Sequence, residues 1–309
     1  MADQNPTPAP VFHFHYAGAT DTGMVRDHNE DAYKLPANTD RDTLASKGYL
    51  YVLADGMGGH QKGEVASAIT IETVASEYYT SVIDLPAHKP EKAIIKALTA
   101  AIEKANDHVM HATQGGGTTI VAAVLYDNTM VAMNVGDSRA YLLRDNDLRL
   151  ISRDHSLVSR LVEMGKITEE EALTHPRRNV LYQALGQGSD IEIHVVQQKL
   201  QINDVVILCS DGLWGEVGDS AIKEALNNDD DPLTTIQKLV SLANQTGGPD
   251  NITAIVIQVS DQEAPADAYG SQPQSPLAED KDDTKPSMPA VQPRHQKPDT
   301  LPESGLWVD

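Results

Sequence analysis

A series of short apolar segments between residues 118 and 152 constrains the fold more than any other feature of the chain. These segments are rich in β-branched residues, and the connections Asp127-Asn128 and Asp145–Asp147 are typical of hairpin turns. Strands joined by such short turns pair antiparallel. Helical periodicity before and after them indicates an α+β fold, in which two antiparallel sheets pack face to face beneath covering helices. The predicted elements are strands 12–18, 32–35, 50–54, 118–126, 130–135, 140–144, 148–152, 192–198, 205–209 and 252–259, and helices 65–83, 91–111, 156–164, 168–173, 220–227 and 233–245.

A change in composition near Val259 and Ser260 marks a domain boundary. Eight of the chain's 17 prolines lie beyond it, in a segment without apolar periodicity. Such a segment buries too little surface to offset its loss of conformational entropy. We therefore predict one domain over residues 10–259, a disordered N-terminal segment over 1–9, and a Pro-rich, acidic, disordered tail over 260–309.

Composition also narrows the class of protein. The 309 residues carry a net charge of −21, which argues against nucleic acid as a partner because phosphate backbones attract basic surfaces. No segment approaches the roughly 18 continuous apolar residues of a membrane span, and the N-terminus does not resemble a signal peptide. Cys209 is the only cysteine, so an intramolecular disulfide is excluded. These features predict a cytoplasmic protein, and we expect a monomer.

Four acidic segments share one setting, because each places a carboxylate at a predicted strand end or in a tight turn. They are Arg26–Asp31, Asp55-Gly56, Ser210–Gly212 and Gly247–Asn251. Taken alone, each could be an ordinary turn aspartate. Four such segments in one domain indicate a site. Carboxylate and carbonyl oxygens favour Mg²⁺ or Mn²⁺, whereas no set of Cys and His residues has the spacing of a zinc site.

In their order along the chain, these segments resemble the bacterial form of the metal-dependent (PPM, type 2C) protein serine/threonine phosphatases. The resemblance covers about residues 10–259. Its motifs are GMVRDHNEDA at 23–32, VLADGMGGHQKGEVAS at 52–67, GGTTI at 116–120, VGDSRAYL at 135–142, RDHS at 153–156, ALG at 184–186, LCSDGLW at 208–214 and PDNIT at 249–253. The family implies a four-layer αββα arrangement, in which helix pairs flank a central β-sandwich that carries a two-metal site at one end.

The resemblance also implies ligands for two Mn²⁺ or Mg²⁺ ions. Asp55 would bridge both ions and the Gly56 carbonyl would bind one of them, while Asp211 and Asp250 would complete the other. Two cations lower the pKa of a bridging water, which can then attack phosphorus directly, and they neutralise charge on the phosphoryl oxygens. No covalent phosphoenzyme is needed. Cys209, the only thiol, lies in an apolar strand and is better explained as a core residue than as a nucleophile.

Other residues would surround these ions. Arg26 would hold the substrate phosphate, because a planar guanidinium can pair with two oxygens at once. Glu30, Asp31 and Asn251 would lie around the ions, partly through bound waters. These roles imply hydrolysis of phosphoserine and phosphothreonine on proteins, which would reverse the action of a cognate bacterial-type serine/threonine kinase.

Two positions leave parts of the family pattern open. Some members have a histidine two residues after the bridging aspartate as a proton donor, but this chain has Met57, so the general acid is unassigned. His60 is better explained as a surface residue or as a neighbour of the site. Asp137 matches an aspartate that holds a third, weakly bound metal in the family. It could equally cap a turn between two strands, since Gly215 stands where many members have a further acid.

Segment 153–188 resembles the mobile flap beside the family's active site. Its positive charge would attract a phosphopeptide, although basic side chains on helix ends can also be simply solvated. The basic residues are Arg153, Arg160, Lys166, Arg177 and Arg178. The alternative function is a regulatory module that binds a phosphoprotein without turnover, and a third hypothesis is an enzyme that acts on small phosphorylated metabolites. The sequence leaves open the substrates, the choice between Mg²⁺ and Mn²⁺, and the role of the tail.

Overall fold

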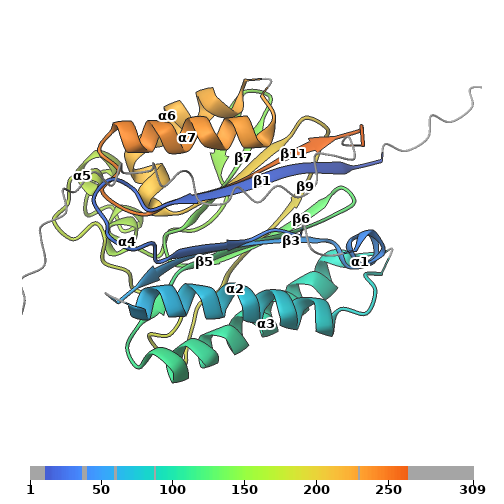
Figure 1. Cartoon of the computed structure of the whole chain (residues 1–309), viewed down its shortest axis with the longest axis horizontal. Coiled ribbons are helices and arrows are strands. Elements are labelled where there is room, and N and C mark those ends of the chain that lie inside the picture. Colours follow the sequence, from blue (N-terminus) through green and yellow to red (C-terminus); the bar gives the residue numbers. More distant parts are fainter. Residues whose placement is uncertain (1–10, 37–39, 59–60, 87, 229, 264–309) are drawn as a thin grey trace, which may run out of the picture. The chain divides into compact units, whose positions relative to one another are not determined.

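A computed structural model describes residues 11–36, 40–58, 61–86, 88–228 and 230–263 (Figure 1). The predicted N-terminal segment, most of the predicted tail and His60 lie outside the described residues. Among the helices that fall within these ranges, none is both long and apolar enough to cross a membrane.

Two antiparallel sheets form the centre of the domain, as predicted. One has five strands in the order β1-β11-β10-β7-β8, and the other has six, in the order β2-β3-β5-β6-β9 with β4 paired to β3. The first comprises β1 (His13–Asp21), β11 (Ile252–Ser260), β10 (Val205–Cys209), β7 (Arg139–Arg144) and β8 (Asp147–Leu150). The second comprises β2 (Asp31–Lys34), β3 (Tyr49–Met57), β4 (Gly117–Thr118), β5 (Ile120–Tyr126), β6 (Thr129–Val135) and β9 (His194–Lys199).

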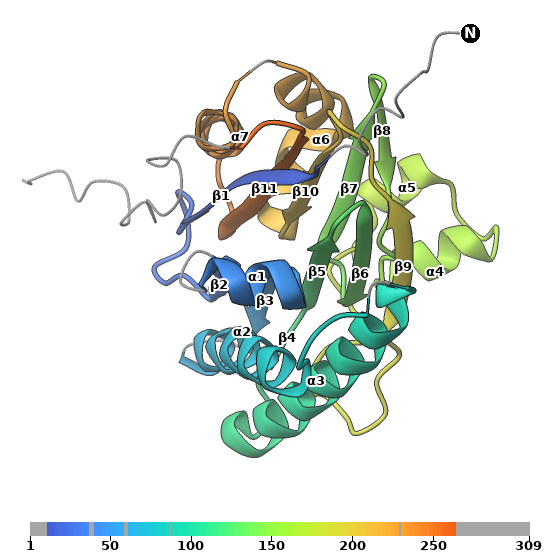
Figure 2. The same cartoon turned by 90° about the vertical axis from the view of Figure 1, so that its right-hand side faces the viewer.

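A pair of helices covers the outer face of each sheet, which confirms the four predicted layers (Figures 1 and 2). Helices α2 (Gln61–Ser81) and α3 (Pro90–Thr113) pack on the six-stranded sheet. Helices α6 (Asp211–Leu226) and α7 (Pro232–Gln245) pack on the five-stranded sheet. Each helix buries one apolar face and leaves the other in water.

The strands in the middle of the sheets are buried on both faces. In β5, Val121, Ala123 and Leu125 pack between the sheets against side chains such as Val206 and Ile255. The residues between them face α2 and α3. This period of two explains the nearly continuous apolar run in the sequence. It also fixes the strand register, because a slip of one residue would exchange the two faces.

Two-residue turns connect β5 to β6 and β7 to β8. In the second hairpin, Arg144 pairs with Asp147 across the turn. Asp145 and Asn146 both have a positive φ, 49° and 60°. That combination defines the type I′ turn, whose twist matches the twist of paired strands. Asp and Asn tolerate this conformation, which is why the turn could be recognised from its residue types.

The prediction of α6 was incomplete. The helix begins at Asp211 rather than at residue 220, and Gly218 interrupts it with a non-helical backbone conformation (φ 76°, ψ 155°). Its first half contains Gly212 and Gly215, which lower helix propensity and obscure the apolar period. As a result, Asp211 opens a helix instead of lying in a free turn.

The short helices follow their capping residues. Helices α4 (Leu157–Glu163) and α5 (Glu169–Leu173) confirm the predicted pair in segment 153–188, and the side chains of Ser156 and Thr168 cap them. Helix α1 (Arg41–Lys47) was not predicted. It buries a single side chain and therefore has no apolar period in the sequence.

Candidate metal centre

The ends of strands from both sheets bring three of the predicted acids together. Asp31, the first residue of β2, lies directly opposite Asp55 of β3 in the six-stranded sheet. Asp55 is two residues before the end of its strand, not at the tip, because Gly56 and Met57 continue it by pairing with β4. In the other sheet, β10 ends at Cys209 and the chain turns into α6, whose first residue is Asp211.

The buried carboxyl groups of Asp55 and Asp211 lie in contact with each other. Burial raises the pKa of Asp211 to about 6, and the negative charge of Asp250 adds to the effect. Burial, together with the charges of Asp31 and Asp211, raises the pKa of Asp55 well above its usual range. Carboxyl groups in such contact need a shared proton or a cation between them. Their oxygen atoms are the ligands that Mg²⁺ and Mn²⁺ prefer, so this donor set fits divalent cations.

Asp31 belongs to the same group of acids. It is 9% exposed, and burial raises its pKa to about 7. The Ser210 hydroxyl donates to its Oδ2 over 2.8 Å. The same Ser210 oxygen accepts from the Thr253 amide over 3.0 Å, which ties the carboxyl to the beginning of β11. Asp31 is therefore held by both sheets.

Asp250 is close to this group but has another partner. Its Oδ2 accepts a hydrogen bond of 2.7 Å from Arg26 Nη2, and the two side chains are 31% and 50% exposed. In the part of the chain that the structure describes, no three Asp, Glu, His or Cys side chains are grouped closely enough to hold one ion by themselves. The structure thus places Asp55 between Asp31 and Asp211 as separate neighbours, and it places Asp250 beside Arg26.

Asn251 positions the segment that carries Arg26 and Glu30. It is 4% exposed. Its amide group donates to the carbonyls of Thr22 and His28, both over 2.9 Å, and its Oδ1 accepts from the Glu30 amide over 2.8 Å. One buried side chain therefore fixes both ends of this segment.

Gly56 lies where β3, α2 and the Glu30 backbone meet. A Cβ atom at this position would be 2.2 Å from the Gly63 carbonyl oxygen and 2.5 Å from the Glu30 carbonyl oxygen. The Gly56 amide itself donates to the Glu30 carbonyl over 3.1 Å. Only glycine allows this approach, which holds the main chain next to Asp55 in one position.

Two threonines hold the main chain of Asp55, and the sequence interpretation gave them no role. The Asp55 carbonyl accepts from the Thr118 hydroxyl and from the Thr119 amide, both over 2.8 Å. The Thr119 hydroxyl accepts from the Asp55 amide over 3.1 Å and contacts the Ser138 hydroxyl over 2.6 Å. The sequence signal that could have indicated these roles is the motif GGTTI. Its two threonines follow no apolar pattern, so they could not be explained as core residues.

Asp137 lies in the turn between β6 and β7 and is 6% exposed. Burial, followed by the charge of Asp211, raises its pKa well above the usual range. The indole N–H of Trp214 donates to the Asp137 carbonyl over 3.1 Å. The guanidinium of Arg139 stacks on that indole, 3.4 Å from the ring centroid, and also binds Asp154 over 3.2 Å. This assembly fixes the Asp137 turn and was not anticipated from the sequence.

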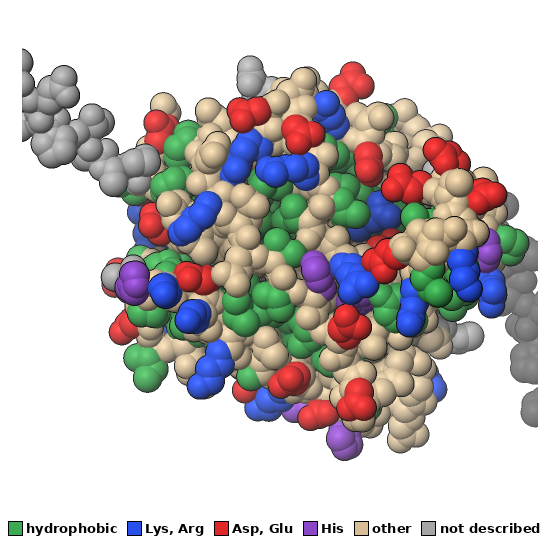
Figure 3. Space-filling view, turned by 180° about the vertical axis from the view of Figure 1, so that it is seen from behind, with side chains coloured by type: hydrophobic (Ala, Val, Ile, Leu, Met, Phe, Trp, Pro, Cys, Tyr) green, Lys and Arg blue, Asp and Glu red, His purple; other side chains and the backbone are tan. Residues whose placement is uncertain are grey.

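The positive charge of segment 153–188 is partly neutralised within the domain. Arg153 pairs with Glu163 at 3.0 Å and with Glu192 at 3.4 Å. On the face shown in Figure 3, basic and acidic side chains alternate without a continuous field of either sign. These contacts favour a structural role for Arg153 over attraction of a phosphopeptide.

Cys209 is completely buried in the core beneath α6 and α7. Burial raises the pKa of its thiol to about 12, which keeps the sulfur protonated near neutral pH. The residue is therefore a core side chain, as predicted.

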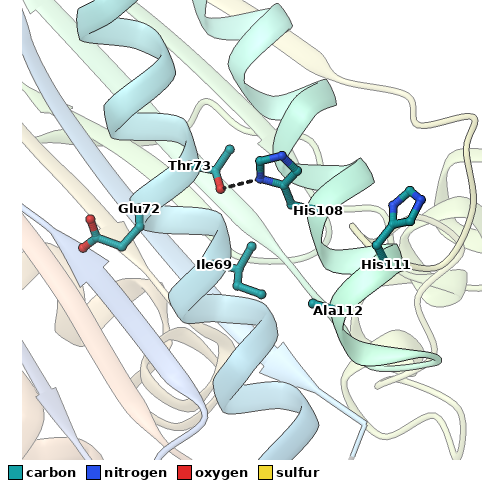
Figure 4. Close-up of a pocket in the computed structure, with 6 residues that line it drawn as sticks. All are labelled: Ile69, Glu72, Thr73, His108, His111 and Ala112. Atoms are coloured by element: carbon teal, nitrogen blue, oxygen red, sulfur yellow. Dashed lines mark hydrogen bonds between the residues drawn. The ribbon is translucent and has the colours of Figure 1, made fainter.

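A separate hollow of roughly 530 Å³ lies between α2 and α3. Figure 4 shows His108 pointing toward Thr73, with a contact of 3.2 Å between Nδ1 and the hydroxyl, while Glu72 points away. This hollow is lined by Ile69, Glu72, Thr73, His108, His111 and Ala112, and none of the predicted site residues is among them.

Comparison with known proteins agrees with this geometry. Residues 27–256 match the family model described as protein phosphatase 2C. The serine/threonine phosphatase Stp of Listeria welshimeri is 34% identical over 245 residues, which cover 77% of this chain and 93% of that protein. The serine/threonine protein phosphatase PstP of Mycobacterium tuberculosis is 36% identical over 252 residues, which cover 80% of this chain and 45% of that longer protein.

Solved structures give the same result. The crystal structure of M. tuberculosis PstP/Ppp has a TM-score of 0.69 and 35% identity, and the match covers 81% of this chain and 99% of that chain. The catalytic domain of PstP in complex with two manganese ions has a TM-score of 0.67 and 34% identity, covering 82% of this chain and 100% of that chain. In its sequence motifs, its two-sheet fold and its buried acids, this chain belongs to the protein phosphatase 2C family of enzymes.

Proposed function

We propose that this protein hydrolyses phosphoserine and phosphothreonine in other proteins with the help of two Mn²⁺ or Mg²⁺ ions. The observation that carries the proposal is the buried contact between Asp55 and Asp211, next to Arg26. Two carboxyl groups in contact attract a divalent cation, and the nearby guanidinium is suited to a phosphate. The relatives' names, which describe serine/threonine phosphatases, support the choice of substrate class.

Four residues would hold the ions. Asp55 would contact both, Gly56 would contribute its carbonyl oxygen, and Asp211 and Asp250 would complete the second ion's protein ligands. Bound metal would supply an activated water and would offset negative charge on the phosphoryl group. Asp137 would add a ligand for a third, weaker ion, and its fixed carbonyl and buried carboxyl support that role.

The surrounding residues position the reacting groups. Arg26 would bind two phosphate oxygens through its guanidinium, which requires it to leave or share the Asp250 carboxylate. Glu30 and Asp31 would orient bound water, and Asn251 keeps the segment of Arg26 in place. Met57 has no proton to donate, so the general acid comes from elsewhere in the site.

The proposal also covers the kinase partner, the oligomeric state, the location and the domain bounds. A protein phosphatase of this class would oppose a cognate serine/threonine kinase. Action as a monomer and a location in the cytoplasm remain predictions from the sequence. Residues 10–259 as the catalytic domain, with 153–188 as its flap, are likewise part of the proposal.

A direct assay tests the proposal. The full chain is incubated with p-nitrophenyl phosphate, a phosphothreonine peptide or a small phosphorylated metabolite, each with Mn²⁺ and again with excess chelator. We expect turnover of the peptide and the nitrophenyl ester that chelator abolishes, with the metabolite a poor substrate. Binding of the phosphopeptide without turnover would instead identify a regulatory module. Preference for the metabolite would contradict the protein substrate.

A further inference from the structure

Met24 and Val25 are large apolar side chains that are exposed to solvent, 70% and 66% respectively. Single exposed apolar residues are common on protein surfaces and need no explanation. Among the large exposed apolar residues of the described chain, however, these are the only two that are adjacent in sequence. They directly precede Arg26, the residue proposed to bind the phosphate. We call this pair the apolar ledge.

The backbone of the ledge is held in one conformation. Gly23 has a φ of 78°, and a Cβ there would be 2.2 Å from the Asp250 carbonyl oxygen. The Met24 amide donates to the Gly248 carbonyl over 2.8 Å. On either side of the ledge, the Asn251 amide group binds the carbonyls of Thr22 and His28. A ligand that contacts the ledge therefore orders little additional main chain, which favours binding.

The main chain of the ledge adjoins the segment that carries Asp250, since the Met24 amide bonds to the Gly248 carbonyl. Arg26 follows Val25 in the sequence, and its guanidinium contacts Asp250 over 2.7 Å. Adjacent residues of an extended peptide are spaced about 3.3 Å apart. A peptide whose phosphate is held at Arg26 would therefore carry its neighbouring side chain past the ledge. An aliphatic neighbour would cover Met24 and Val25, whereas a polar neighbour would lose water without gaining a partner.

Building on the proposed function, we infer that the apolar ledge makes the enzyme select phosphoproteins with an aliphatic residue immediately beside the phosphorylated serine or threonine. Met24 and Val25 are thus specificity-determining residues that contact the substrate next to the reacting phosphate. The occupant is a phosphopeptide segment of another protein, because the ledge is joined to the phosphate-binding arginine and not to a separate surface.

The test compares phosphothreonine peptides that differ only at one flanking residue, leucine or serine, placed before or after the phosphothreonine. The measured quantity is the ratio of kcat/KM for the leucine and serine peptides, which a uniform change in activity does not alter. We expect the full chain to favour leucine about ten-fold at one flank, at the lower end of the range for small apolar contacts. In Met24→Ser/Val25→Thr, and to a smaller degree in Val25→Thr, the ratio should fall toward one.

Ile83→Thr is the matched control. Ile83 is 82% exposed and lies just beyond the C-terminal end of α2. The opposite end of this 21-residue helix lies near Glu30, so the length of the helix, about 30 Å, separates Ile83 from the candidate site. The control should keep the wild-type ratio. Absence of chelator-sensitive turnover for every peptide would overturn the proposed function itself. Turnover with the same leucine-to-serine ratio in wild type and in Met24→Ser/Val25→Thr would overturn the role of the ledge alone. The role of the ledge would also be overturned if Ile83→Thr lowered the ratio as much as Met24→Ser/Val25→Thr does.

Discussion

Two acidic side chains, Asp55 and Asp211, are in contact at the centre of the candidate site although their charges repel each other. Burial and the nearby carboxylates raise the pKa of both, so keeping them ionised without a cation destabilises the folded chain. A divalent cation reverses this effect, because it binds the folded state and not the unfolded chain. The carboxyl contact therefore links metal binding to stability.

Asp211→Asn tests this link. We expect hydrolysis of p-nitrophenyl phosphate to fall at least ~100-fold and the rise in melting temperature on addition of Mn²⁺ to shrink. Without metal, the variant should be as stable as wild type or more stable, because one buried charge is gone. Calorimetry with and without Mn²⁺ measures the two effects on stability, and a hydrolysis assay measures the loss of activity.

Asp219→Asn is the control for this substitution. Asp219 also lies on α6, but its carboxylate accepts from the Tyr141 hydroxyl over 2.9 Å and is not in the predicted ligand set. This variant should keep the full response to Mn²⁺. An unchanged Mn²⁺ response in Asp211→Asn would remove Asp211 from the ligand set.

His155 introduces a dependence of stability on pH. The side chain is completely buried, and its Nδ1 accepts from the Gly136 amide over 3.2 Å. Burial lowers its pKa below the ordinary value of 6.5. Its charged neighbours are Arg153, Asp154, Glu192 and His194. The neutral ring is therefore favoured in the folded state, and its contribution is complete above pH 6.5 and is lost as the pH falls through the lowered pKa.

We predict that His155→Asn removes this part of the pH dependence. The unfolding free energy of wild type, minus that of the variant, should fall as the pH is lowered from 7 to 5, by at most about 1.4 kcal/mol per pH unit. Urea denaturation in chelator at several pH values gives this difference. A constant difference over the range would mean that His155 does not titrate between the folded and unfolded states.

At the residue scale, the sequence located the acids but not the groups that hold them. Asp55 and Asp211 could be found because each lies near the end of an apolar strand, and Asp31 because it begins strand β2. Thr118, Thr119 and Trp214 could not be assigned, because their roles are contacts with main-chain atoms of residues far away in the chain. Such contacts depend on tertiary packing, which local patterns do not encode.

At the scale of elements, the approach of β3 to α2 supports the site. Gly56 in the strand faces Gly63 in the helix so closely that neither position has room for a Cβ atom. The helix therefore begins directly against the strand that carries Asp55. Any side chain added here would push the two elements apart and displace the Asp55 main chain.

Gly56→Ala should destabilise the protein by about 1–3 kcal/mol, the usual effect of overpacking a tight contact. Gly215→Ala is the matched control, since it adds the same methyl group in α6 with no neighbour within 4 Å. The control should be neutral or up to ~1 kcal/mol more stable, because alanine favours helix. Urea denaturation in chelator compares them. Equal stability of the two variants would show that β3 and α2 can separate without cost.

Each helix or strand could be predicted to the extent that its sequence shows a clear apolar pattern. Strand β10 was predicted with its observed bounds, Val205–Cys209, because all five residues are apolar and buried. Helices α3 and α7 were recognised from their apolar faces. The first half of α6 and all of α1 were missed, because glycines weaken the pattern in one and only Leu44 is buried in the other. Local signals fail where few side chains reach the core.

At the scale of the whole molecule, the candidate site depends on the packing of two sheets. Asp31 and Asp55 come from one sheet, while Asp211 and Asp250 come from the ends of strands in the other. The core between the sheets sets their separation. A substitution in that core would therefore weaken metal binding as well as stability, and the two effects should change together.

The domain boundary can be tested by truncation. Strand β11 continues to Ser260, which pairs with His13, and the next residues still make contacts, because the Gln262 carbonyl binds His15 and Glu263 forms an ion pair with Arg41. We predict that a chain ending after Glu263 keeps the unfolding free energy and the peptide kcat/KM of the full chain. Denaturation and steady-state kinetics on the two chains compare them.

A shorter chain, ending after Ile257, provides the contrast. It lacks Val259, which is 2% exposed and whose carbonyl and amide bond to the Asn203 amide and the Asp204 carbonyl. Burial of one such side chain contributes about 1.5–3 kcal/mol, so this chain should unfold at lower urea concentration and lose Mn²⁺-dependent activity. If the chain ending after Glu263 also lost activity while remaining folded, the tail would take part in catalysis, and the domain would extend beyond the sheet that β11 completes.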